Sequence, residues 1–256
     1  MRVSANMTFI IFMTPHPLES TVKLTNATVL ITGANRGLGA AFAREALARG
    51  ARKVYAAARD PASVTLPGVV PIRLDVTKPA EIAAVARECG DVTLLINNAG
   101  IAATGGFLAE TSVASAQRHL ETNFFGPLRL TQAFAPVLAA HGGGAILNVL
   151  SIASWISGPL LGVYGMSKSA AWAMTNGVRT ELREQQTQVL ALHVSFVDTD
   201  LTKGLDVPKL APADVVRTAL DALEAGASEV LADELTRNVH AGLSADPAVY
   251  LQPITR

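Results

Sequence analysis

The feature that most constrains the fold of this 256-residue chain is a regular alternation of short β-branched runs with longer Ala- and Leu-rich amphipathic stretches. This alternation is typical of βαβ units, in which helices cover both faces of a parallel sheet. It predicts a doubly wound, Rossmann-type α/β fold with a seven-stranded parallel sheet and helices on both faces. The predicted strands are 29–31, 53–56, 70–74, 94–96, 145–149, 189–194 and 229–231, and the predicted helices are about 37–49, 79–88, 111–139, 163–186, 212–225 and 233–242.

No internal repeat or low-complexity linker divides the chain, so we expect a single catalytic domain over residues 24–256. Residues 1–23 are interpreted as a loosely ordered N-terminal extension. Its apolar run at 9–13 is cut short by Pro15 and Pro17, which makes it too short for a secretory signal or a membrane span.

The composition narrows the possible functions. The chain has 21 basic and 21 acidic residues and lacks a basic cluster, so we do not expect a nucleic-acid partner. Its only cysteine is Cys89, and Cys-x-x-Cys and His-Glu-x-x-His patterns are absent. We therefore expect a cytoplasmic protein without a disulfide, a metal site or a membrane partner.

A glycine-rich loop, Thr32-Gly33-Ala34-Asn35-Arg36-Gly37-Leu38-Gly39, joins the first predicted strand to the first predicted helix. Glycines at such a turn let a pyrophosphate approach the N–H groups of a helix N-terminus, where the partial positive charge favours an anion. The alternative is an ordinary glycine-rich turn. The position directly after the first strand of a βαβ array favours dinucleotide binding.

The second predicted strand ends where dinucleotide sites often place an acid for the ribose 2′-hydroxyl. Here Ala58 occupies that position, Arg59 follows it, and Arg36 lies in the glycine loop, so we predict that NADP(H) is preferred over NAD(H). Asp60 is the competing feature, because a shift of one residue would bring it to the ribose. Otherwise it caps the next turn or pairs with Arg59. In a second alternative, both arginines are solvated surface charges.

Tyr164 and Lys168 are four residues apart at the start of a predicted helix, and this spacing places them on one face. The pKa of a free tyrosine is about 10, and we expect the ammonium of Lys168 to lower the pKa of Tyr164 toward the working range. Ser151 follows the fifth predicted strand, where its hydroxyl could donate to a carbonyl oxygen. The spacing alone is also compatible with an exposed helical pair.

Together these motifs resemble the short-chain dehydrogenase/reductase family, in its short single-domain branch. The resemblance includes Asn97-Asn98-Ala99-Gly100 and covers about residues 24–231. It implies that Tyr164 protonates the carbonyl oxygen as hydride arrives from NADP(H), that Ser151 holds this oxygen, and that Lys168 binds the ribose. It also implies that Asn123 holds a water molecule that relays protons to Lys168. The implied catalytic residues are Asn123, Ser151, Tyr164 and Lys168, and the implied cofactor residues are Thr32, Gly33, Asn35, Arg36, Gly37, Leu38, Gly39, Ala58, Arg59, Asp75, Val76, Asn98, Ala99, Gly100, Tyr164, Lys168, Val197 and Thr199.

The chain departs from the family pattern after the sixth strand, where Ser195-Phe196 stand in place of Pro-Gly. We expect Phe196 to add bulk beside the cofactor. The predicted substrate pocket is almost entirely apolar, which favours a hydrophobic ketone, an aldehyde or the matching secondary alcohol. Its predicted residues are Ile101, Ile152, Ala153, Trp155, Leu160, Leu161 and Phe196.

Two other functions remain compatible with these residues: an epimerase or dehydratase of the same family, and a non-catalytic NADP(H)-binding regulator. The short chain disfavours the first alternative, because only about 25 residues follow the seventh predicted strand. The presence of both Tyr164 and Lys168 disfavours the second. The resemblance also implies a homodimer or homotetramer formed through the helices at about 111–139 and 163–186.

Overall fold

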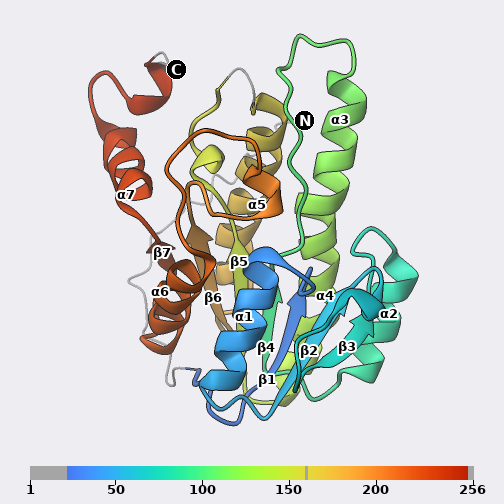
Figure 1. Cartoon of the computed structure of the whole chain (residues 1–256). Coiled ribbons are helices and arrows are strands. Elements are labelled where there is room, and N and C mark those ends of the chain that lie inside the picture. Colours follow the sequence, from blue (N-terminus) through green and yellow to red (C-terminus); the bar gives the residue numbers. More distant parts are fainter. Residues whose placement is uncertain (1–21, 159–160, 253–256) are drawn as a thin grey trace, which may run out of the picture.

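The computed structural model describes residues 22–158 and 161–252, and within them all seven predicted strands form one parallel sheet in the order β3-β2-β1-β4-β5-β6-β7 (Figure 1). The central strands carry continuous apolar runs and are buried, as expected for strands covered on both faces. The strands are β1 Thr28–Thr32, β2 Lys53–Ala58, β3 Val70–Arg73, β4 Leu94–Asn97, β5 Ala145–Val149, β6 Gln188–His193 and β7 Glu229–Leu231.

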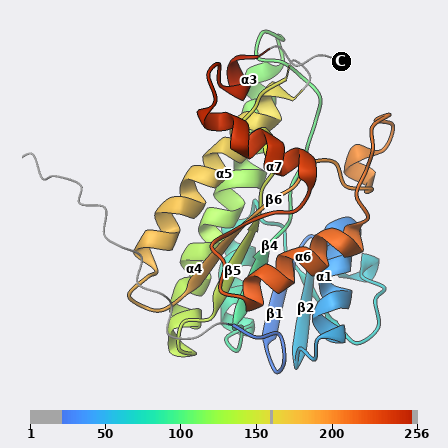
Figure 2. The ribbon, with the colours of Figure 1, turned by 90° about the vertical axis from the view of Figure 1, so that its left-hand side faces the viewer.

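Helices cover both faces of the sheet and enclose two apolar layers (Figure 2). One layer lies between the sheet and α1 and α6, and it includes Phe42 and Leu220. The other lies under α2, α4 and α5, and it includes Phe134 and Val178. The helices are α1 Gly37–Ala48, α2 Pro79–Glu88, α3 Ser112–Leu120, α4 Gly126–Ala140, α5 Gly162–Glu181, α6 Pro212–Glu224 and α7 Glu234–Ala241.

Two helix predictions need correction. The helix predicted at 111–139 is interrupted by a π-helical turn, Glu121–Phe125, which separates α3 from α4. The helix predicted to reach residue 186 ends at Glu181, because the chain turns at 182–187 and Gln186 takes a positive φ of 60°. Hydrophobic periodicity separates neither feature from a regular helix, because the chain stays helical through the π-helical turn and continues as turns directly after Glu181.

Most of the predicted N-terminal extension, residues 1–21, lies outside the described residues. Within the described part, Val22 packs against the core and Leu24 is fully buried. The Leu24 backbone N–H donates to Glu224 on α6 at 2.9 Å. Chain packing against the sheet and helices therefore begins by Val22.

Arg49, at the end of α1, connects this helix to α6. Its guanidinium contacts Glu45, Asp221 and Glu224 at 2.8–3.0 Å, and its side chain is only 16% exposed. We expect Arg49→Met, which keeps most of the aliphatic stem, to lower the free energy of unfolding by about 1–2 kcal/mol, because the contacts of a largely buried guanidinium with three carboxylates are lost. Urea unfolding measures this change.

The matched control for Arg49 is Arg217→Ala on α6. Arg217 pairs with Asp214, but both side chains are more than half exposed. Exposed ion pairs contribute little, so the control should change stability by no more than about 0.5 kcal/mol. Equal effects of the two substitutions would contradict a special role for Arg49.

Candidate active site

A cleft of about 580 Å³ opens at the carboxyl ends of the central strands. It lies where the strand order reverses between β1 and β4, which is the usual ligand position in an open parallel sheet. It brings together segments that are distant in sequence. The predicted site residues that line it are Gly33, Asn35, Arg36, Gly37, Leu38, Ala58, Arg59, Asp75, Val76, Asn98, Ala99, Gly100, Ile101, Ser151, Tyr164, Lys168, Val197 and Thr199.

The glycine loop at the start of α1 fits a dinucleotide phosphate. Gly33 and Gly37 have φ of +65° and +54°, conformations that favour glycine. The N-cap residue Arg36 makes no side-chain capping hydrogen bond, so the first-turn N–H groups have no side-chain cap and border the cleft.

Gly39 has no Cβ, and this allows the loop to pack closely against the segment after β4. A Cβ built on Gly39 would lie 2.1 Å from the Gly33 carbonyl oxygen and 2.6 Å from Asn98 Nδ2, and Nδ2 itself donates to the Thr32 and Gly33 carbonyls. We therefore expect Gly39→Ala to lower the free energy of unfolding by about 1–3 kcal/mol and to weaken binding of a dinucleotide at this loop, because the backbone has to move. Thermal unfolding and a cofactor titration measure both effects.

Gly177→Ala is the matched control, because a Cβ there meets nothing within 4 Å and the residue lies inside α5. In a helix interior this change should be neutral or stabilising by up to about 1 kcal/mol. If Gly39→Ala were as harmless as this control, the proposed tight packing of the loop would be wrong.

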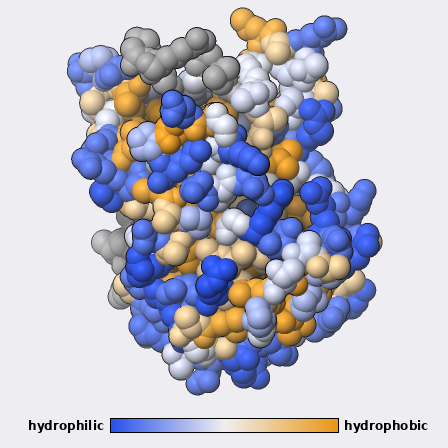
Figure 3. Space-filling view, viewed as in Figure 1, coloured by the Kyte–Doolittle hydropathy of each residue, from blue (hydrophilic) through white to orange (hydrophobic). Residues whose placement is uncertain are grey.

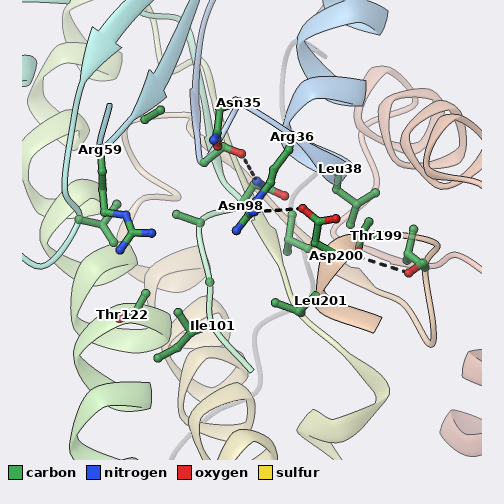
Figure 4. A pocket seen from close by; sticks show the side chains of 18 of the residues that line it. Asn35, Arg36, Leu38, Arg59, Asn98, Ile101, Thr122, Thr199, Asp200 and Leu201 are labelled. Atoms are coloured by element: carbon green, nitrogen blue, oxygen red, sulfur yellow. Dashed lines mark hydrogen bonds and ion pairs between the residues drawn. The ribbon is translucent and has the colours of Figure 1, made fainter. Parts of the chain in front are cut away.

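Two arginines border the cleft, one in the glycine loop and one just after β2. Figure 4 shows Arg36 and Arg59 approaching it from different sides, with Arg36 Nη1 3.0 Å from Asp200 Oδ2. Asp60 also lines the cleft, but its side chain accepts from the Ala62 N–H and caps the short helical turn that follows. The capping role considered for Asp60 is thus confirmed.

Asp75 also lines the cleft and lies close enough to Arg59 to feel its charge. Burial alone would raise the pKa of Asp75. Hydrogen bonds from the backbone N–H and hydroxyl of Thr77, together with Arg59, outweigh it and hold the pKa below its ordinary value. Asp75 is therefore an ionised acceptor at neutral pH.

Ser151, Tyr164 and Lys168 meet at the base of the cleft. Ser151 ends the segment after β5, while the other two lie on the first turns of α5. The Ser151 side chain hydrogen-bonds Tyr164. Lys168 Nζ donates to the Val149 carbonyl at 2.8 Å and lies 5.9 Å from the centroid of the Tyr164 ring. The trio can thus present two hydroxyl groups and an ammonium to one ligand atom or its neighbours.

The predicted effect of Lys168 on Tyr164 is wrong for this structure. Burial raises the pKa of Tyr164 to about 12, although the hydrogen bond from Ser151 lowers it in part. Burial also lowers the pKa of Lys168 to about 8, because the ammonium is desolvated. The spacing of the two residues was informative about position, but the ammonium is directed to the Val149 carbonyl rather than to the phenol oxygen.

Asn123 lies within the π-helical turn, and its side chain is fully engaged. Oδ1 accepts from the Ile101 N–H, while Nδ2 donates to the Ile101 carbonyl and to Ser167 Oγ, each at 2.9 Å. A Cβ on Gly100 would lie 3.3 Å from Asn123 Oδ1 and 3.9 Å from Lys168 Nζ. Asn123 is thus next to the trio, and its implied water-holding role stays a prediction.

The departure after β6 affects the cleft differently from our expectation. Val194 and Ser195 line it, whereas Phe196 does not, and the Phe196 carbonyl accepts from the Leu210 N–H instead. Thr199 lies at the cleft next to the glycine loop, since a Cβ on Gly37 would lie 3.2 Å from its methyl group. This part of the cleft is therefore bordered by small and branched side chains.

The predicted substrate wall is only partly present. Ile101 lines the cleft, but Ile152, Ala153 and Leu161 do not, and Leu160 lies outside the described residues. The Trp155 ring stacks on buried His193, with centroids 4.0 Å apart. Several lining residues escaped prediction, among them Leu201 and Thr122, which directly precedes Asn123.

In residues 22–158 and 161–252, no helix combines the length and hydropathy that a bilayer span requires. Nor does this part of the chain hold a group of three or more His, Cys, Asp and Glu side chains arranged for a metal ion.

Comparison with known proteins places these residues in context. The family model for short chain dehydrogenases matches residues 27–209. The chain is 34% identical over 195 residues to dehydrogenase/reductase SDR family member 7B of Bos taurus, covering 69% of this chain and 60% of that relative, so it spans about three fifths of that protein. It is 30% identical over 250 residues to NADP-dependent 3-hydroxy acid dehydrogenase of Schizosaccharomyces pombe, covering 86% of this chain and 95% of that one.

A solved structure that is similar to this chain is also a short chain dehydrogenase. A short chain dehydrogenase from Burkholderia cenocepacia in complex with NADP matches with a TM-score of 0.86 and 37% identity, over 91% of this chain and all of that one. The protein therefore belongs to the short-chain dehydrogenase/reductase family of NAD(P)-using oxidoreductases.

Proposed function

We propose that this protein is an NADP(H)-dependent reductase of hydrophobic ketones or aldehydes, which also oxidises the matching secondary alcohols. The observation that carries the proposal is the meeting of Ser151, Tyr164 and Lys168 at the base of a cleft that Arg36 and Arg59 border. A carbonyl group needs a proton on oxygen when its carbon receives hydride, and the two hydroxyls are placed to serve that oxygen. NADPH, when bound, supplies the hydride.

In this proposal Tyr164 is the acid. Its raised pKa, about 12, keeps the phenol protonated at neutral pH, so the hydroxyl is available as a donor. Ser151 donates to the same oxygen and orients it. Lys168, whose ammonium donates to the Val149 carbonyl beside the trio, is assigned to the ribose hydroxyls.

The preference for NADP(H) is supported by charge. Ala58 leaves the end of β2 without an acid, and Arg36 and Arg59 offer guanidinium groups that match a phosphate. The Schizosaccharomyces relative and the Burkholderia structure carry NADP in their names. Asp200 is no obstacle, because its ion pair with Arg36 is more than half exposed on both sides and such pairs contribute little.

Apolar contacts support a hydrophobic substrate. Ile101, Val149, Leu150 and Leu201 line the cleft near the trio. The test is to follow NADPH oxidation with a panel of aliphatic and aromatic ketones and aldehydes, together with sugars and charged keto acids. Faster turnover of apolar carbonyls supports the proposal, and isomerised or dehydrated product without net NADPH consumption would replace it by epimerase or dehydratase activity.

We also propose a homodimer or homotetramer formed through the outer faces of α4 and α5. Phe125, at the start of this region, is 38% exposed, and its ring faces the guanidinium of Arg129. Light scattering of the purified protein measures the number of subunits.

A further inference from the structure

His119 is a buried histidine beside the trio to which no catalytic role has been given. It lies on the last turn of α3, is 1% exposed, and precedes Asn123 by one helical turn. Nδ1 is 2.8 Å from the Ser115 carbonyl oxygen, and Nε2 is 3.1 Å from the backbone nitrogen of Ala103. Both ring nitrogens thus have a backbone partner.

These partners determine the protonation of the ring. A carbonyl oxygen only accepts, so Nδ1 carries a proton and donates it to Ser115. The Ala103 N–H only donates, so Nε2 accepts and is unprotonated. The contact therefore requires neutral imidazole, because a proton on Nε2 would face the Ala103 N–H.

His119 and Asn123 act on the same segment, the chain that leaves β4 and runs beside α3 (Figure 1). Asn123 binds both backbone polar groups of Ile101, and His119 binds Ala103, two residues further on. Successive turns of one helical stretch thus hold alternate residues of the segment.

This segment borders the reacting end of the cleft. Ile101 lines the cleft, and the His119 ring meets the Tyr164 ring edge-on, with centroids 6.4 Å apart. The far end of the segment is weakly covered, because Phe107 is 54% exposed and Leu108 is fully exposed. Figure 3 shows a hydrophobic protrusion at the top of the molecule, where Figure 1 draws the loop that precedes α3. Phe107 does approach Gly162 on α5. Because the far end is so exposed, the hydrogen bonds of Ile101 and Ala103 contribute much of what keeps the segment in place.

We propose that His119 is a positioning residue whose neutral imidazole fixes Ala103 and thereby the substrate wall beside Tyr164. The inference rests on the proposed reductase function, since it assigns that wall to the carbonyl substrate. It predicts an effect on substrate binding with no effect on the glycine loop or the adenosine end of the cleft, which His119 does not contact.

The first experiment compares His119→Phe with His119→Gln. Phenylalanine fills the space but cannot accept from Ala103, whereas the Gln side-chain oxygen reaches about as far as Nε2 and can accept. We expect His119→Phe to raise KM for the carbonyl substrate about three- to tenfold, with Kd for NADPH unchanged, and His119→Gln to restore most of the loss. Ser115→Ala is the control: it removes a hydroxyl 3.4 Å from Nδ1 but keeps the carbonyl that the ring binds.

Hydrogen exchange tests the contact without any substrate. The Ala103 amide should be protected in wild type and His119→Gln and should exchange about three- to tenfold faster in His119→Phe, relative to its intrinsic rate. If no carbonyl is reduced by the wild type, the proposed function fails while this exchange result still decides the contact. Unchanged exchange of the Ala103 amide in His119→Phe would overturn the inference. An unchanged KM for the carbonyl substrate in a His119→Phe variant that is normally folded and stable would also overturn it.

Discussion

Replacing Tyr164 with phenylalanine is expected to lower kcat for carbonyl reduction by about 10²- to 10⁴-fold, the usual contribution of a positioned general acid. The change deletes the hydroxyl and keeps the ring that lines the cleft. The Tyr164 proton is held firmly, with a pKa of about 12, and the Ser151 hydroxyl alone does not replace it as an acid. Kd for NADPH should stay within about threefold, because the phenylalanine ring preserves the cleft shape.

Steady-state kinetics and a fluorescence titration with NADPH measure the two quantities. Tyr55→Phe is the matched control, since the Tyr55 hydroxyl binds Asp91 and Lys53, away from the cleft lining. It should cost some stability and leave kcat unchanged. A Tyr164→Phe variant that retains more than a tenth of wild-type kcat would remove Tyr164 from its proposed role.

The strands and the cleft could be predicted because their signals are local and strong. Buried parallel strands such as β4 and β6 contain apolar runs without polar alternation, and a glycine loop is recognised by its place after the first strand. Parallel strands then bring their carboxyl ends together, so Ser151 after β5 and Asn98 after β4 had to meet at one edge. That topological step brings Ser151 to the cleft, whereas Tyr164 and Lys168 reach it from α5.

The failures concern side-chain direction and long-range contacts. Trp155 follows Ser151 closely and was assigned to the substrate wall, but a large ring gains more from burial, and it stacks on His193 between β6 and α7. The Arg36–Asp200 pair joins residues 164 positions apart, for which the spacing carries no signal. His119 was missed for the same reason, since its partner Ala103 belongs to an irregular segment.

The pKa of Tyr164 shows that residue spacing does not determine where a side chain points. A spacing of four residues places Lys168 on the same helical face, but the ammonium is turned toward the Val149 carbonyl, and desolvation dominates for both residues. Burial therefore keeps the Tyr164 phenol protonated, which is the form that donates a proton in carbonyl reduction. Oxidation of an alcohol requires the phenolate and therefore benefits more from a charge placed near the phenol.

The second large effect expected is on cofactor choice. Wild-type protein should bind NADPH more tightly than NADH, and Arg36→Ala or Arg59→Ala should each weaken NADPH binding by about 10- to 100-fold, because charge-assisted hydrogen bonds contribute about 1.5–3 kcal/mol each. The two guanidiniums come from different elements, the glycine loop and the end of β2 (Figure 4). The double variant should lose about 10²- to 10⁴-fold if the two contributions add.

Binding of NADH should barely change in any of these variants, since it has no 2′-phosphate for the arginines to contact. Arg87→Ala, on the exposed last turn of α2, removes the same charge away from the cleft and controls for a general loss of positive potential. Asp200→Asn is the complementary variant: it frees Arg36 from its ion pair and should leave NADPH binding unchanged or slightly tighter. Equal wild-type affinities for the two cofactors, or a parallel loss of both in the arginine variants, would show that Arg36 and Arg59 do not read the phosphate, and the absence of an acid at Ala58 would then leave the site open to either cofactor.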